Sequence, residues 1–394
     1  QLELTAAMVG GGEIAGLLKF RNEDLAEGRN LLGRLAMTIG HELNLQNQRG
    51  LTLNGQQGGA LFSLPTTSTG YGNITGYSNI GPGAATTQVM DASQLKPSEY
   101  RLIFEGSPVA PVLTRMSDGK VFNATSTPPL NMGNLATGFD ADGLRFIVPA
   151  ATLAAAVSGN SMLFKPFSTA ASEIEALVHN PDELAAASAL TANINKNNTG
   201  KLQLTQLGAN DFTGIPAAQH PVRLIFDGAG QVTYQIYDHL SSTWSAASAP
   251  YTPGQPITIN GWSITLTGTP AAGDTVDVAN ALDFGEAFRL NAGNAGAFLD
   301  LRDKKVFDEG TTLSDGFSAA MAVVGTRTQS VQLAEKLSST VAKNLKMDRT
   351  AVSGVNLDEE AARLLQYQQA YQASSKVIQI AQSLFDSVLN AVGR

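Results

Sequence analysis

The chain has 394 residues, enough for roughly two to three domains with packed cores. Its formal net charge of -8 argues against binding to nucleic acid without regard to sequence, because such binding needs a basic surface. The chain has no cysteine, which excludes disulfides, zinc–thiolate sites and cysteine nucleophiles. It also has no apolar run of the length that crosses a membrane.

The first predicted element is a helix over residues 13–49. Its apolar residues recur at helical spacing and predict one buried face, made of Leu25, Leu32, Leu35, Ile39 and Leu43. Residues 51–92 are rich in Gly, Thr, Ser and Asn, a composition typical of loops. We therefore assign residues 1–92 to the first part of a helical domain.

An internal repeat follows, in which the spacing of apolar residues changes to two. Residues 100–106, YRLIFEG, resemble residues 222–228, VRLIFDG, and later segments align in the same order. Each copy supplies short strands separated by turn residues, the pattern of a small antiparallel barrel or sandwich. The sequence predicts two β-modules of one type, over residues 93–168 and 205–285.

The segment between the two copies, residues 169–204, is predicted to be a helical connector with a break at Pro181. Helical spacing returns over residues 286–394, which we assign to the second part of the helical domain. Apolar residues from Phe317 to Leu345 follow one face, and a break near Ser353 separates this helix from the last one.

The last predicted helix is amphipathic. Asn356 is a candidate N-cap, and residues 358–360 place negative charge in the first turn, where the helix dipole favours it. Beyond this start, residues recur in alternating steps of four and three: Leu357, Ala361, Leu364, Gln368, Tyr371, Ser375, Ile378, Gln382, Phe385 and Leu389. A second stripe beside this ladder includes Val377 and Leu384, and one helix can bury two stripes only against more than one neighbour.

The predicted fold class is α+β and multidomain, with a discontinuous, coiled-coil-like helical domain into which the two antiparallel β-modules are inserted. The first and last helical parts must meet, because neither can bury its apolar face alone. We expect the first turns of the last helix, Leu357 to Leu365, to pack in this domain. We expect Tyr371 to Leu389 to be loosely held or covered by a neighbouring molecule.

No motif predicts catalysis, and we expect no cofactor. His41-Glu42 resembles the start of a zinc-protease helix, but Leu45 occupies the position of the second histidine, so His41 is expected to be an exposed helix residue. Residues 140–143, DADG, begin like a calcium loop but lack its later ligands, so we expect a turn there and leave a bound calcium ion open.

Residues 353–378, SGVNLDEEAARLLQYQQAYQASSKVI, closely resemble the C-terminal signature of the bacterial flagellar axial proteins, the rod, hook and hook-associated family. Residues 11–58 and 302–330 resemble helical segments of its hook-associated members. The resemblance covers both ends of the chain strongly and the middle weakly. The family also has an N-terminal helical signature that this sequence lacks, so we expect the chain to be a fragment without the N-terminal part.

The resemblance implies a structural, self-assembling protein rather than an enzyme, an adapter that joins hook to filament. It implies export through the flagellar type III secretion apparatus and a location outside the cell, in the flagellum. The implied partners are further copies of the chain, the hook protein, the next junction protein, and a cytoplasmic export chaperone at the C-terminal region. Nucleic acid and membrane are not among them.

The predicted assembly and chaperone interface lies on the last helix, because an uncovered apolar helix needs shielding before assembly. Its residues are Leu357, Leu364, Tyr367, Tyr371, Val377, Ile378, Leu384, Phe385 and Leu389.

Two other classes of function stay open at this point. The paired β-modules with Gly- and Thr-rich loops also suit a secreted surface adhesin. An enzyme that cleaves glycans would need opposed carboxylates, whereas Glu359 and Glu360 lie side by side on a helix surface.

Overall fold

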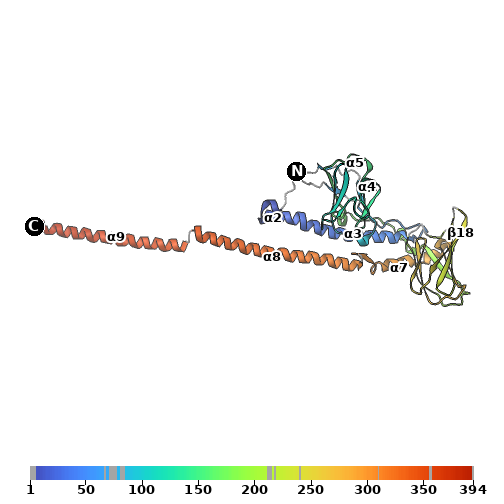
Figure 1. Cartoon of the computed structure of the whole chain (residues 1–394). Coiled ribbons are helices and arrows are strands. Elements are labelled where there is room, and N and C mark those ends of the chain that lie inside the picture. The colour runs from blue at the N-terminus through green and yellow to red at the C-terminus, as the bar shows by residue number, and fades with distance from the viewer. Residues whose placement is uncertain are drawn as a thin grey trace. The chain divides into compact units, whose positions relative to one another are not determined.

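A computed structural model of the chain describes residues 6–65, 68–70, 78–79, 85–210, 215–216, 219–238, 241–308, 310–354 and 357–392. The chain divides into two units, Gln1–Val324 and Gly325–Arg394. Helices and two groups of strands make up the first unit, and the second unit is helical (Figure 1). The fold class is therefore α+β, with several antiparallel sheets.

The N-terminal helical segment consists of α1 (Ala6–Val9), α2 (Gly12–Lys19), the π-helix η1 (Phe20–Asp24) and α3 (Leu25–Gln48). The helix predicted over residues 13–49 is thus present, with a π-helical turn inside it. Gly10 to Gly12 all have positive φ angles, between 76° and 144°, which only glycine adopts without strain, and they separate α1 from α2.

The prediction of the buried face of α3 is partly wrong. Leu35 is buried, but Leu32 and Ile39 are 46% and 38% exposed. A row of mostly polar side chains, each four residues from the next, is buried instead: Asn30, Arg34, Thr38, Glu42 and Gln46. The physical reason is clear for Arg34, Glu42 and Gln46, which are buried because each meets a charged or polar side chain from residues 294–308.

Two asparagines of α3 show how neighbouring backbone is held. The Asn44 side-chain oxygen accepts hydrogen bonds from the backbone N–H groups of Leu61 and Phe62, at 2.8 and 2.9 Å, and its amide donates to the Phe62 carbonyl. The Asn47 side chain accepts from the N–H of Ala185 and donates to the carbonyl of Gly59, both at 2.9 Å. These side chains therefore fasten two loops, far apart in sequence, to one helix.

The returning chain lies along the same polar row of α3. It comprises η4 (Ala281–Leu290), α7 (Gly293–Asp300), β22 (Lys305–Phe307) and β23 (Thr311–Thr312). Three pairs join it to α3: Gln46 with Asn294 at 2.6 Å, Glu42 with Lys304 at 2.6 Å, and Arg34 with Asp308 at 2.9 Å. The partners on α3 move toward its N-terminus as the returning chain advances, so the two segments run antiparallel.

The first β-module contains two groups of strands, antiparallel except for the parallel pair of β4 and β11. In one, β3 (Ser68–Gly70), β11 (Asn160–Lys165), β6 (Tyr100–Glu105), β7 (Ala110–Arg115) and β8 (Val121–Phe122) are neighbours in that order, and β4 (Ser78–Asn79) also pairs with β11. The other is β5 (Thr86–Val89), β10 (Leu144–Ile147) and β9 (Phe139–Ala141). Side chains from both groups, including Phe104 and Phe146, share one core, joined by the short helices α4 (Met132–Thr137) and α5 (Ala150–Ala154).

The second β-module repeats this strand order. Its larger sheet is β14 (Leu190–Ile194), β21 (Thr275–Asn280), β16 (Val222–Phe226), β17 (Gln231–Asp238) and β18 (Thr243–Pro250). Its smaller sheet is β15 (Gln203–Ala209), β20 (Trp262–Thr267) and β19 (Pro256–Ile259). The repeated motif of the sequence gives β6 in one module and β16 in the other, each between corresponding neighbours. Strands outside the predicted ranges also join, since β5 begins at residue 86 and β14 at residue 190.

The prediction of a helical connector over residues 169–204 is wrong. This segment holds only α6 (Ala170–Glu173) and the 3-10 turn η3 (Pro181–Glu183) as helical elements. The rest supplies strands: β12 (Glu175–Ala176) pairs with β2 (Phe62–Ser63), and β13 (Ala187–Ser188) pairs with β1 (Gly50–Leu51). Pro181 lacks the N–H that a continuing helix needs, and pairing with the segment after α3 supplies the backbone partners instead.

Two long helices end the chain, α8 (Leu313–Ser353) and α9 (Leu357–Val392). Within the first unit, Ala320 of α8 packs with Phe307 and with Leu31 and Leu35 of α3 in a small core. Among the residues that the structure describes, no helix combines the length and hydropathy needed to span a bilayer.

Candidate assembly surface

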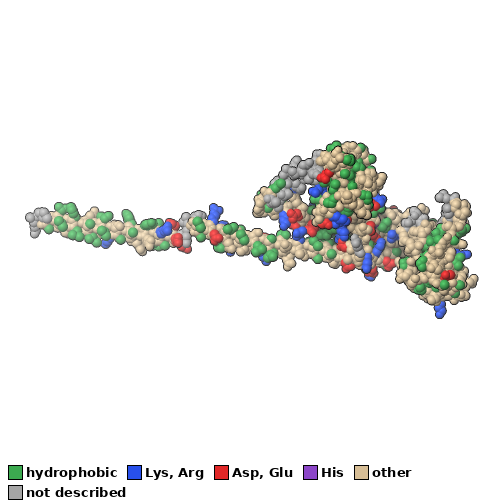
Figure 2. Space-filling model, viewed as in Figure 1, with side chains coloured by type: hydrophobic (Ala, Val, Ile, Leu, Met, Phe, Trp, Pro, Cys, Tyr) green, Lys and Arg blue, Asp and Glu red, His purple; other side chains and the backbone are tan. Residues whose placement is uncertain are grey.

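The second unit exposes long apolar stripes on α8 and α9, as the green side chains along these helices show in Figure 2. Every described member of the predicted interface is more than half exposed: Leu364, Tyr367, Tyr371, Val377, Ile378, Leu384, Phe385 and Leu389. On α8, Val331, Leu337, Val341 and Leu345 are exposed to a similar degree. Single exposed apolar residues are ordinary, but contiguous stripes of this length mark a surface that a partner covers.

The first described turns of α9 are exposed within their own unit, and their packing in the helical domain stays a prediction. Leu364 and Leu365 are 62% and 57% exposed, as much as residues further along the helix. The side chain of Leu357 and the candidate N-cap Asn356 lie outside the described residues. The whole apolar ladder of α9 from Leu364 onward, rather than its distal half, is therefore a candidate surface.

The two helices differ in charge. Residues 325–353 of α8 carry five Lys or Arg against two Asp or Glu, whereas α9 carries four Asp or Glu against two Lys or Arg. Three of the acidic groups of α9, Asp358 to Glu360, lie in its first turn, where they complement the helix dipole. The two apolar stripes are therefore flanked by opposite net charge.

The first unit carries another apolar stripe, which the sequence reasoning missed. Leu17, Phe20, Leu32 and Ile39 on α2, η1 and α3 are 38 to 61% exposed, and Leu25 is half-buried. Leu25, Leu32 and Ile39 are spaced by seven residues, the repeat of a helix that packs on another helix. The sequence analysis places Leu25, Leu32 and Ile39 on the buried face, because a buried face and an interface share the same periodicity.

A π-helical turn keeps this stripe on one side. The N–H of Leu25 donates to the carbonyl of Phe20, the bond to the fifth residue back that defines the turn. Such a turn holds one residue more than a turn of α-helix. Because each residue of an α-helix rotates the chain by about 100°, the turn changes by that angle the direction in which the residues before it face relative to those after it. Because of η1, Leu17 and Phe20 face the same way as Leu25, Leu32 and Ile39.

The polar row of α3 holds this helix to neighbouring segments of the first unit. Arg34 is 5% exposed, donates to the Leu95 carbonyl and to Asp308, and its guanidinium lies 4.7 Å from the ring centre of Phe307. One side chain thus joins α3, the start of the first β-module and β22. Gly33 of α3 also approaches the loop after β11, since a Cβ there would lie 1.9 Å from the Phe167 carbonyl oxygen.

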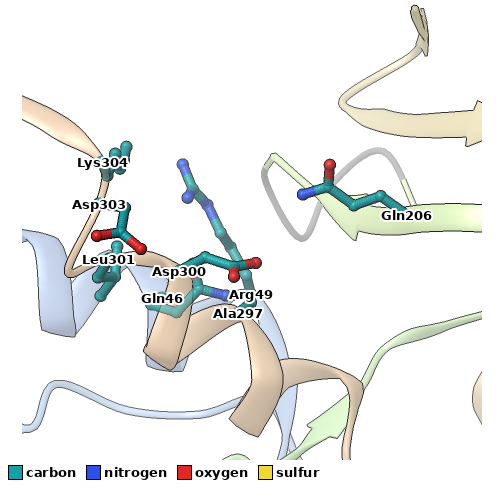
Figure 3. Close-up of a pocket in the computed structure, with 8 residues that line it drawn as sticks. All are labelled: Gln46, Arg49, Gln206, Ala297, Asp300, Leu301, Asp303 and Lys304. Carbon is teal, nitrogen blue, oxygen red and sulfur yellow. The ribbon is translucent and has the colours of Figure 1, made fainter. Parts of the chain in front are cut away.

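A pocket of about 370 Å³ lies between the end of α3, α7 and β15 (Figure 3). Its lining residues are Gln46, Arg49, Gln206, Ala297, Asp300, Leu301, Asp303 and Lys304. Most of its charged groups already have partners: Lys304 binds Glu42, Asp303 binds Arg302, and Arg49 donates to the Asn210 carbonyl. The pocket therefore does not present an acid–base pair for catalysis.

The motifs considered for metal chemistry have structural roles. His41 is half-buried rather than exposed as expected, and burial lowers its pKa below 6.5. The Asp140 carboxylate pairs with Arg145 at 2.7 Å, and Asp142 accepts from Tyr100 and pairs with Arg115. No group of three His, Cys, Asp or Glu side chains suited to a metal ion occurs among the described residues.

Comparisons with known proteins match both ends of the chain. Residues 1–62 match the model of the flagellar hook-associated protein FlgK helical domain, and residues 349–391 match that of the flagellar basal body rod FlgEFG protein C-terminal region. Flagellar hook-associated protein 1 of Salmonella typhimurium is 26% identical over 99% of this chain, and that of Escherichia coli is 22% identical over 99%. The chain spans about half the length, 51%, of these relatives.

A solved structure has the same fold. The flagellar hook junction protein FlgK of Burkholderia pseudomallei superposes with a TM-score of 0.65 at 22% identity, covering 89% of this chain and 64% of that one. Both ends of the chain are therefore similar to segments of flagellar axial proteins. Over nearly its whole length, the chain is similar to flagellar hook-associated protein 1.

Proposed function

We propose that the chain is a structural, self-assembling adapter between the hook and the filament of a bacterial flagellum. The observation that carries this proposal is the exposed ladder of α9, which repeats every seven residues at Leu364, Tyr371, Ile378 and Phe385. A seven-residue apolar repeat favours packing against another helix. Similarity to flagellar hook-associated protein 1 over 99% of the chain supports the same role. The protein then acts by packing of subunits rather than by catalysis.

The proposal assigns a role to each part of the chain. In the assembled flagellum, α8 and α9 pack in a coiled-coil-like manner with neighbouring molecules, and the first unit makes lateral contacts. The two β-modules, each a small sandwich, face outward. Partners would be other copies of the chain, the hook protein and the next junction protein, all outside the cell.

Before assembly, the same apolar ladder must be shielded from water by a partner. An apolar stripe of this length, open to water, favours aggregation, so an export chaperone in the cytoplasm is expected to bind α9 along the ladder from Leu364 to Leu389. Export through the flagellar type III apparatus then delivers the unfolded chain. No feature of the described residues favours the adhesin interpretation.

A chromosomal deletion of codons 354–394 tests the role of α9 as a whole. The two β-modules have cores of their own, so they are expected to fold normally, as measured by circular dichroism and limited proteolysis of the purified protein. Cells are expected to make hooks without attached filaments, counted by electron microscopy. Normal filaments on hooks that contain the truncated protein would contradict the proposal.

A further inference from the structure

The two β-modules are alike in strand order but differ in how they join the helical body, which consists of α3 and the returning chain from η4 to β23. We infer that the first module is fixed to this body, whereas the second module turns as a unit on a narrow joint. This movement lies within one subunit and goes beyond the proposed assembly role.

The first module shares its core with α3. Met37 of α3 is 3% exposed and belongs to the cluster that includes Phe104 and Phe146. On the same helix, Gly33 lies so close to the loop after β11 that a Cβ would be 1.9 Å from the Phe167 carbonyl oxygen. Turning the first module would expose Met37 to water and separate closely packed backbone, so this module stays with α3.

The second module has a core of its own. Every buried member of that core lies between Leu190 and Val278, within the module. The chain enters the module after Ala189 and leaves it at Ala281, and the Ala281 N–H donates to the Ala189 carbonyl at 3.0 Å. Because entry and exit lie side by side, the module can turn about this one point, which two distant crossings would prevent.

The apolar contact at this point is small. A cluster of buried residues lies at the crossing, and its members are Leu51, Ala187, Ala189, Ala281 and Phe288. Ile215 packs against it from the second module and is half-buried. Three of the five buried members are alanine, whose side chain offers little apolar area. Domains joined by so small a contact are expected to move relative to one another, whereas a large apolar interface holds them together.

Two exposed hydrogen bonds also link the second module to the body. Arg49, at the end of α3, donates to the Asn210 carbonyl at 2.9 Å, and the Gln219 N–H donates to the Asp283 carboxylate at 2.9 Å. Because water competes for these groups, each bond contributes little to holding the module. Both bonds can open and close again without unpacking a core.

The pocket of about 370 Å³ lies at the same joint (Figure 3). Gln206 of β15 lines it from the second module, and Ala297 and Asp300 of α7 line it from the body. Protein interiors are packed as densely as organic crystals, so a space of this size marks an interface that is not close-packed. Turning of the module changes the separation of β15 and α7 across this space.

Distances between spin labels on the whole chain test this movement. The chain has no cysteine, so labels attach only to engineered ones. Leu299→Cys on α7 is the common reference, because this side chain is 77% exposed. Ser248→Cys on β18 reports on the second module, and Ala110→Cys on β7 is its matched control on the first, since both are exposed strand residues. Pulsed electron spin resonance gives the width of each distance distribution.

We expect the distance distribution from the second module to be about twice as broad as that from the first. Equal widths would overturn the inference. They would leave the proposed assembly role intact, because the deletion of residues 354–394 tests that role separately.

Removing the two exposed bonds tests whether they hold the second module. Arg49→Ala with Asp283→Ala is expected to broaden the distribution from the second module further and to leave that from the first unchanged. The control is Arg302→Ala, at a surface ion pair of the body, which is expected to alter neither width. An unchanged width in the double variant would contradict the joint described here.

Discussion

The guanidinium of Arg34 lies 2.9 Å from the carboxylate of Asp308, although 274 residues separate the two in sequence. Both β-modules lie between them in the chain. The pair therefore closes the helical body around its two insertions. Phe307 packs against the Arg34 side chain, and the Leu95 carbonyl accepts a second hydrogen bond from it, so three segments depend on one residue.

Replacing this residue is expected to destabilise the first unit. Arg34→Ala leaves the Leu95 carbonyl without its donor, leaves Asp308 with only the more distant Lys96 at 3.8 Å, and opens a gap beside Phe307. We expect a loss of about 2–4 kcal/mol in the free energy of unfolding, measured by chemical denaturation. Arg302→Ala is the matched control, because Arg302 pairs with Asp303 on the surface, and it is expected to leave the free energy of unfolding nearly unchanged. Equal effects of the two variants would contradict the assigned role of Arg34.

The amide of Asn44 gives a second prediction. Asn44→Ala removes three hydrogen bonds to residues 61 and 62 and leaves buried backbone groups unpaired. We expect a loss of about 2–3 kcal/mol and faster proteolysis near residues 59–63. Asn197→Ala, at an exposed position, serves as the control and is expected to leave both measurements unchanged. Unaltered proteolysis in Asn44→Ala would show that the loop is held by other contacts.

Two glycines of α3 are expected to respond oppositely to the same change. Gly33→Ala forces a methyl group onto the Phe167 carbonyl oxygen and is expected to cost about 1–3 kcal/mol. Gly28→Ala meets open space, so the better helix propensity of alanine is expected to stabilise by up to about 1 kcal/mol. Thermal denaturation of both variants measures the difference. A stabilised Gly33→Ala variant would mean that α3 and the loop after β11 lie further apart.

Stability is expected to depend on pH through His41. Burial lowers the pKa of His41 in the folded protein below its usual 6.5, so the unfolded chain binds a proton more readily. The folded state therefore loses stability as the pH falls below about 6.5, until the lowered folded pKa is passed. His41→Gln removes this contribution, and denaturation midpoints of both proteins across that range test it. Parallel pH profiles would contradict the assignment.

The sequence predicted the strand-bearing repeat because YRLIFEG and VRLIFDG encode equivalent strands, β6 and β16, with the same neighbours. The prediction of the buried face of α3 was partly wrong, because it used only the spacing of apolar residues to find the core. The buried row from Asn30 to Gln46 repeats every four residues and is a visible signal, but its partners, such as Lys304 and Asp308, are more than 250 residues away. Pairing of this kind depends on tertiary structure and cannot be derived from local periodicity.

The prediction of a helical connector was wrong for a related reason. Residues 169–204 contain Ala-rich stretches that favour a helix, yet β12 and β13 pair with strands near residues 50 and 63. Those partners satisfy the backbone groups, and Pro181 prevents a continuous helix. The ladder of α9 is exposed from Leu364 onward, and its role as an interface stays a prediction.

Two double variants of α9, compared in cells, test the assembly role of this helix most directly. Ile378→Glu with Phe385→Glu places charge on the ladder, whereas Gln369→Glu with Ser383→Glu adds the same charge away from it. We expect the ladder variant to leave hooks without filaments, counted by electron microscopy, while the control variant assembles normally. Normal filament numbers in the ladder variant, with the altered protein present at the junction, would contradict the central claim that this exposed helix face holds the assembly together.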